Sequence, residues 1–300
     1  MALITSDSDE QRTILREIIT YNIMNAVGLA LLTIIVVTAW LSPTIHRIPT
    51  WFMLLFSFIV SCIGNLLIVG HQMGNQPPWK LCLLQAATTY SAPVLFSSYA
   101  TMFVVETYVI TLRSRNTVPK IHAMVFHILP AIGFVGVFLL NLILGNTKGA
   151  PPSRLKPTGI YCHFSNPLPR KITAGITMLC MSLCLVLEAL LYRRLWQLSR
   201  TIGGLAALRQ RITLDAFIRA VILSVWPLFA LIFSVLQFRL ASGNNRLKES
   251  TDLLSILSWL PLTMALCFGS QKDMIRLCLF WRKNKPPTVQ NFDTNDRSSV

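Results

Sequence analysis

The amino-acid sequence predicts an all-α membrane protein: a seven-transmembrane helix bundle with a short amphipathic helix after the last span. Its composition gives the first reason. Hydrophobic residues make up 53% of the 300 residues and charged residues only 13%, whereas a soluble domain usually carries about 25% charged residues. The second reason is that apolar runs of about 20 residues, long enough to cross a bilayer core, recur along the chain.

We expect seven spans, which in chain order are Tyr21–Ser42, Trp51–Val69, Cys82–Leu112, Ile121–Leu144, Ile172–Tyr192, Ala216–Phe238 and Leu253–Ser270. The third is longer and more polar than the others, so it should be tilted. Because the runs are continuously apolar rather than alternating, a helical bundle is favoured over a transmembrane barrel.

The remaining segments flank this bundle of residues 21–271. Residues 1–20 are expected to be an extracellular N-terminal segment and not a signal peptide, because no basic region precedes a short apolar core. Lys272–Lys283 interleaves apolar and basic residues, as an amphipathic helix on a membrane surface does, and Cys278 within it is a palmitoylation candidate. Residues 284–300 lack an apolar run, so a disordered cytoplasmic tail is expected.

The charge distribution gives an orientation. The net charge of +15 would suggest nucleic acid in a soluble protein. Here the basic residues lie in short loops between the spans, where membrane orientation places them, so binding to nucleic acid is disfavoured. With the N-terminus outside, 16 Lys and Arg residues lie on the inner side and 11 on the outer side. This bias favours an outer N-terminus and a cytoplasmic C-terminus.

The cysteines are consistent with that orientation. Of the seven, only Cys82 and Cys162 fall on the outer side, and disulfides form in oxidising compartments. We therefore expect a bridge between the outer end of the third span and the loop before the fifth. Two unpaired thiols are the alternative.

Seven spans, an outer N-terminus and this bridge together resemble the layout of rhodopsin-like G-protein-coupled receptors. Such receptors carry an acidic–Arg–Tyr triplet near the inner end of the third span. Here Glu106, Thr107 and Tyr108 stand there, so the acid and the tyrosine match and a threonine replaces the arginine. The resemblance implies that another arginine takes over that role, or that coupling is unconventional or absent.

The later spans resemble the family in part. The sixth contains Trp226 and Pro227 as direct neighbours, where the family spaces the two by one residue, and the seventh keeps only Pro261 of the family's Asn-Pro-x-x-Tyr motif. The chain thus resembles a divergent member. Its segments Trp40-Leu41-Ser42, Gly70-His71-Gln72 and Pro77-Pro78 are similar to those of receptor-like proteins of basidiomycete fungi.

The resemblance implies a plasma-membrane receptor that senses an extracellular small molecule, lipid or peptide and signals through a heterotrimeric G protein. It implies no enzymatic activity and no cofactor, and retinal is disfavoured because the seventh span has no lysine before Lys272. His122 and His127 stand five residues apart and do not share a helix face, so no metal site is predicted. A membrane transporter or channel is the alternative, although the internal repeats of many transporters are missing.

A ligand pocket is expected at Thr89, Tyr90, Pro93 and Trp226. Thr89 stands seven residues after Cys82, where amine receptors have an acid, so the pocket should be mostly neutral, with hydroxyls and aromatic rings. The alternative is that these polar residues bond neighbouring helices.

An activation switch is expected near the inner ends of the spans. Glu106 and Glu188 are the two acids within spans, and an ionised carboxylate in lipid normally has a partner. For Glu106 the expected partner is Arg219, in a lock that opens on activation or in a static pair. The kink expected at Pro227 in the sixth span could act as a hinge, or it could be fixed. The switch residues are Glu106, Thr107, Tyr108, Arg219, Trp226, Pro227 and Pro261.

The inner loops carry basic residues among apolar ones at helical spacing. A receptor would present this surface to its G protein, and attraction to anionic lipid is the alternative reading. The residues expected there are Arg113, Arg115, Arg193, Arg194, Arg209 and Arg211.

Overall fold

The computed structural model describes residues 3–42, 47–72, 77–113, 120–146, 155–157, 161–201, 227–236, 238–239 and 258–270. These residues are predominantly helical. Five helices are long and apolar enough to cross a membrane, and the chain fits a multi-pass protein of the lipid bilayer.

The long helices are α1 (Leu3–Leu41), α2 (Pro49–Leu66), α3 (Trp79–Arg113), α4 (Lys120–Asn146) and α5 (Leu168–Thr201). A two-stranded antiparallel sheet, β1 (Leu155–Pro157) and β2 (Cys162–Phe164), lies between α4 and α5 in the sequence. Two shorter apolar helices follow, Pro227–Leu236 and α9 (Trp259–Gly269).

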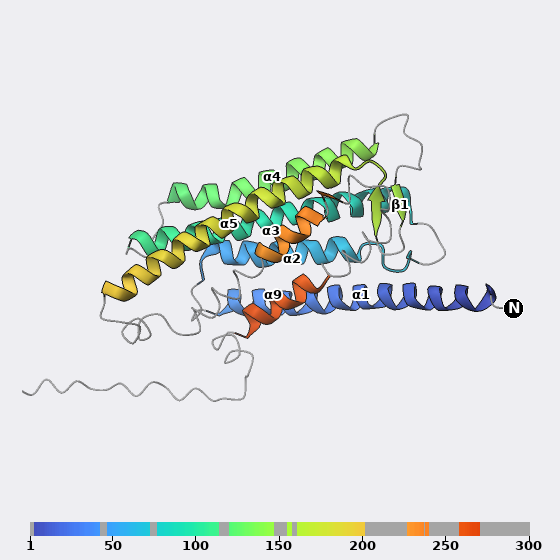
Figure 1. Cartoon of the computed structure of the whole chain (residues 1–300), viewed down its shortest axis with the longest axis horizontal. Helices are drawn as coiled ribbons and strands as arrows, with labels where there is room; N and C mark the ends of the chain where they lie inside the picture. Colours follow the sequence, from blue (N-terminus) through green and yellow to red (C-terminus); the bar gives the residue numbers. More distant parts are fainter. Residues whose placement is uncertain are drawn as a thin grey trace, which may run out of the picture.

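Helix α3 lies in the middle of the bundle. It packs against α2, α4 and α5, while α1 packs against α2 and α9, as Figure 1 shows. Pro93 lies within α3. Because three neighbours surround it, α3 buries side chains on most of its circumference, including Gln85, Ser91 and Ser97 with no exposed surface.

The main apolar core joins α1, α2, α3 and α9. The rings of Phe58 and Phe96 stack at 5.2 Å between centroids, and Trp51 meets Phe268 edge to face at 5.7 Å. Small residues let helices approach closely elsewhere: a Cβ at Gly64 would overlap with the side chain of Thr88.

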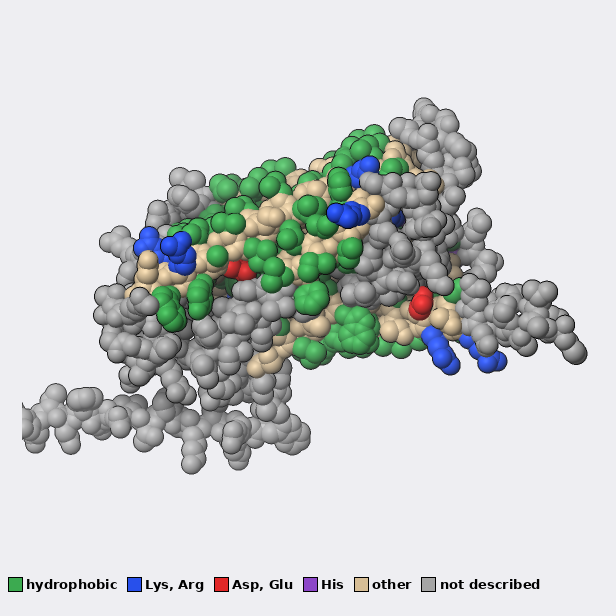
Figure 2. All heavy atoms as spheres, in the orientation of Figure 1, with side chains coloured by type: hydrophobic (Ala, Val, Ile, Leu, Met, Phe, Trp, Pro, Cys, Tyr) green, Lys and Arg blue, Asp and Glu red, His purple; other side chains and the backbone are tan. Residues whose placement is uncertain are grey.

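The outside of the described helices is apolar as well. Hydrophobic side chains cover much of the view in Figure 2, and Lys and Arg side chains appear at the left, at the lower right and in the upper part to the right of the middle. Large exposed side chains of this kind include Ile34, Phe56, Ile132, Leu179 and Val186. In water such a surface would drive association, whereas lipid chains solvate it.

The first five expected spans correspond to α1 to α5, and the third, fourth and fifth lie wholly within their helices. The first span ends one residue beyond α1, and the second runs three residues beyond the end of α2 at Leu66. Helix α1 begins at Leu3, so most of the expected N-terminal segment is helical. Hydropathy marks the part of a helix that suits lipid, but backbone hydrogen bonds continue into polar sequence.

The sixth and seventh expected spans are described only in part. The helix Pro227–Leu236 and α9 lie inside them, and each is shorter than a bilayer crossing. The expected surface helix Lys272–Lys283 and tail 284–300 lie outside the described residues.

Candidate functional site

Polar and aromatic side chains gather at the two ends of α3. We call these the disulfide end, which contains Cys82 and Cys162, and the Glu106 end, which contains Glu106 and Thr50. About 24 residues of α3 separate them, or roughly 36 Å of helix at 1.5 Å per residue.

A disulfide joins Cys82 on α3 to Cys162 on β2, with an S–S distance of 2.06 Å and a Cα–Cα distance of 5.4 Å. Both residues are buried. The bond fixes the β1–β2 hairpin to the first turn of α3.

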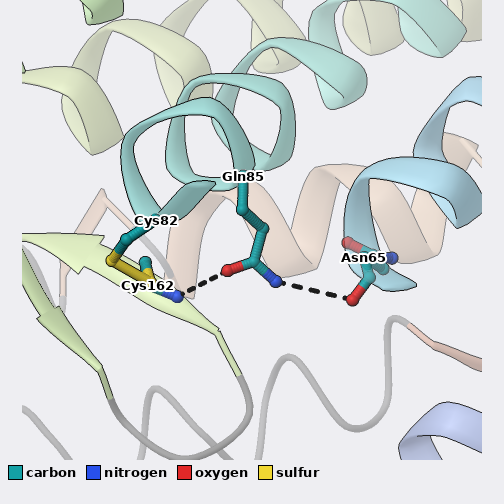
Figure 3. Close-up of a disulfide and its surroundings, with 4 residues drawn as sticks. All are labelled: Asn65, Cys82, Gln85 and Cys162. Atoms are coloured by element: carbon teal, nitrogen blue, oxygen red, sulfur yellow. Dashed lines mark hydrogen bonds between the residues drawn. A yellow bond between two sulfur atoms is a disulfide. The ribbon is translucent and has the colours of Figure 1, made fainter. Parts of the chain in front are cut away.

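Gln85 reinforces this attachment, as Figure 3 shows. The backbone N–H of Cys162 donates to Gln85 Oε1 at 2.9 Å, and Gln85 Nε2 donates to the carbonyl oxygen of Asn65 at 3.4 Å. Asn65 Nδ2 in turn donates to Asn25 Oδ1 at 2.9 Å, and Asn25 Nδ2 donates to the carbonyl oxygen of Tyr21 at 2.8 Å. This amide chain links β2, α3, α2 and α1.

Aromatic residues of the hairpin segment cover the same end. Phe164 lies 5.6 Å from Tyr90 of α3 between ring centroids. Tyr161 forms a small buried cluster with Ile18 and Tyr21 of α1. The hairpin segment therefore contacts α1 as well as α3.

Tyr90 is the best-fixed residue of the expected pocket. It is buried, its carbonyl oxygen accepts a hydrogen bond of 2.7 Å from the Thr173 hydroxyl of α5, and its phenol interacts with the side chain of Arg170. Thr89 is half-buried, and its hydroxyl has no partner among the described residues. Thus α3 carries Thr89, Tyr90 and Pro93 within two turns, while the fourth pocket residue, Trp226, lies outside the described residues.

At the Glu106 end, the carboxylate of Glu106 accepts a hydrogen bond from the hydroxyl of Thr50, in the first turn of α2. Glu106 is 4% exposed and Thr50 is fully buried. Thr107 donates to the carbonyl oxygen of Phe103 at 2.8 Å, one turn back in the same helix, and Tyr108 is half-buried.

Sequence reasoning missed Thr50. The order of the spans gave one indication of this contact: because α2 and α3 follow each other and are antiparallel, the start of α2 lies level with the end of α3. The guanidinium of Arg47, just before α2, lies 5.8 Å from the centre of the Trp51 ring, so a cation stands near the Thr50 turn. The expected partner, Arg219, lies outside the described residues.

The other expected switch and surface residues are spread over several elements. Pro227 is buried and is the first described residue of the helix Pro227–Leu236, and Pro261 is buried within α9. Arg193 and Arg194 are exposed near the end of α5. The structure does not describe the side chain of Arg113, nor any part of Arg115, Arg209, Arg211 and Cys278.

Within α5, the thiol Sγ of Cys184 lies 3.8 Å from Oε1 of Glu188, one turn along the helix. No group of three His, Cys, Asp or Glu side chains able to hold a metal ion occurs among the residues that the structure describes. No model of a known protein family matches the chain, and no curated protein matches it significantly.

Proposed function

We propose that the chain is a seven-transmembrane receptor, divergent from the rhodopsin-like class, with its N-terminus outside the plasma membrane and its C-terminus in the cytoplasm. It senses an extracellular small molecule, lipid or peptide and passes the signal to a heterotrimeric G protein. Ligand binding shifts an equilibrium between inactive and active states through different contacts in each.

The observation that carries this proposal is the organisation of α3. One end is fixed to a hairpin by the Cys82–Cys162 disulfide, and the other buries Glu106 against Thr50. A single helix thus connects a covered end, suited to a ligand, with a buried acid at the opposite face of the membrane.

A transporter or channel is the alternative function. A transporter that couples to ions commonly places charged groups near the middle of the membrane. Within α3 the single acid is Glu106, near one end, and no acid occurs in the sequence of α2 or α4. This distribution favours the receptor.

The test is guanine-nucleotide exchange by purified G proteins of each subtype, with the full chain in nanodiscs and a panel of lipids, volatiles and peptides. The receptor proposal expects ligand-stimulated exchange with one or more subtypes. No stimulation across the panel, together with solute flux in proteoliposomes, would support the transporter instead.

A further inference from the structure

The α3–α5 side of the disulfide end is poor in acids. No acidic residue occurs between Glu17 and Glu106, nor between Glu106 and Glu188, so α2, α4, the β1–β2 hairpin and the disulfide ends of α3 and α5 contain none. The acid Glu17 lies on α1, next to Ile18, which packs with Tyr161. The described charges on the α3–α5 side are the cations Lys80, Arg170 and Lys171.

Arg170 is the cation that reaches inward. It lies in the first turn of α5 and is half-buried. Arg170 and Tyr161 are titratable side chains that act electrostatically on the Tyr90 hydroxyl. One turn along α5 from Arg170, the Thr173 hydroxyl donates to the Tyr90 carbonyl oxygen at 2.7 Å, so the first turns of α5 lie beside Tyr90. A guanidinium has five N–H donors, more than a single phenol oxygen can accept, so it can also bind an anion.

A second observation lies one turn deeper. Thr177 follows Thr173 by four residues and so shares its helix face. Thr173 reaches the carbonyl oxygen of Tyr90, whereas the Thr177 hydroxyl, on a residue 4% exposed, has no hydrogen-bond partner among the described residues. An unpaired buried hydroxyl is costly, and a polar atom of a bound molecule would satisfy it. Thr177 is seven residues from Arg170 on α5, or about 10 Å of helix, so that atom would belong to the body of the molecule and not to its acidic head.

The neighbours of these groups are apolar. The ring of Phe164 covers Tyr90 on the hairpin side, and Ala174 and Met181 are buried on α5. A half-buried cation above apolar residues matches a molecule with an acidic head and a hydrocarbon body. The N-terminal end of α5 also favours negative charge through the helix dipole.

We propose that the disulfide end binds an anionic amphiphile whose carboxylate or phosphate head is held by Arg170 beside Tyr90, with its chain along α3 and α5. This names the ligand class of the proposed receptor and rests on that function for its signalling role. The bidentate geometry of guanidinium with carboxylate or phosphate provides the selectivity for an acid over a neutral alcohol.

The test measures thermal unfolding of the full chain in phosphatidylcholine nanodiscs. Dodecanoate and dodecyl phosphate should stabilise the protein more than dodecanol at equal concentration. Arg170→Gln should weaken the apparent affinity for both anions about tenfold or more, and Arg170→Lys should keep part of it. Arg16→Gln is the matched control, because it removes the same charge from an exposed position on α1.

Equal stabilisation by dodecanol and dodecanoate would overturn the proposal without any variant, and so would equal responses of Arg170→Gln and the native chain. A parallel arm uses phosphatidylglycerol nanodiscs without added acid. If phosphatidylglycerol alone stabilises the native chain and not Arg170→Gln, a bilayer lipid is the source of the anion. If this difference between the two chains appears only when dodecanoate is added, the source is a free acid.

Nucleotide exchange separates this proposal from the receptor function. Binding that depends on Arg170, without exchange by any G protein, would contradict the receptor and support the anion site. Exchange stimulated only by neutral compounds, and equally in Arg170→Gln, would support the receptor and contradict the anion site.

Discussion

The hydroxyl of Thr50 donates a hydrogen bond to the carboxylate of Glu106 and so joins the first turn of α2 to α3. Both residues are buried, and a buried carboxylate without a donor is costly. A neutral hydroxyl thus stabilises the buried carboxylate of Glu106.

We expect Thr50→Val to destabilise the protein by about 1–3 kcal/mol, because it keeps the side-chain volume and removes the donor to Glu106. Thr50→Ser, which keeps the hydroxyl, should lose much less. Thermal unfolding in one detergent checks both, and equal losses in the two variants would show that the hydrogen bond contributes little.

If the Thr50–Glu106 contact holds the resting state, Glu106→Gln and Thr50→Val should both raise basal nucleotide exchange. Arg219→Gln should act in the same direction if Arg219 also partners Glu106. The measurement is basal exchange at matched surface expression. Unchanged basal exchange in all three variants, in a protein shown to couple, would leave Glu106 with a purely structural role.

Removal of the disulfide by Cys82→Ser with Cys162→Ser should lower stability by about 2–4 kcal/mol, the typical range for a native bridge. Cys267→Ser, at a cysteine of α9 that is not part of the disulfide, is the control and should change stability less. Peptide mapping without reduction should recover Cys82 and Cys162 in one linked fragment. Recovery of both as free thiols would contradict the bridge.

Gln85→Leu should loosen the hairpin, because the backbone N–H of Cys162 loses its acceptor while the disulfide remains. Amide hydrogen exchange of the peptide containing Cys162 should become faster by about tenfold, equivalent to ~1.4 kcal/mol. Leu84→Ala, at an exposed neighbouring position, should leave that exchange unchanged. An equal rate in both variants would assign the attachment to the disulfide alone.

Gly28→Val should destabilise the contact between α1 and α9, since even a Cβ there would lie 3.0 Å from Pro261 Cβ. Overpacking of this kind costs about 1–3 kcal/mol. Ala26→Val is the control, because Ala26 is exposed on the same helix. Equal melting temperatures for the two variants would mean that the helices separate without penalty.

Sequence patterns predicted the first five helices well because each contains an apolar run as long as a bilayer is thick. Such runs do not mark where a helix ends, and α1 accordingly begins at Leu3 rather than near Tyr21. The structure also contains the cysteine pair that was expected from membrane side alone.

The polar contacts between helices were harder to predict. A lone Gln85 or Thr50 in an apolar run indicates that some partner exists, but its identity depends on the rotation and depth of two helices. A hydropathy pattern specifies neither the rotation of a helix nor its depth in the membrane. The link from Gln85 to Cys162 and the contact of Thr50 with Glu106 therefore emerged only from the structure.

The close packing of Gly28 on Pro261 also bears on how the protein is made. Helix α1 emerges first from the ribosome, and its partner α9 is more than 200 residues later in the chain. During synthesis the face of α1 that contains Gly28 contacts lipid, or a membrane chaperone, until nearly the whole polypeptide has been inserted. A chain that stops before α9 leaves Gly28 without this packing partner.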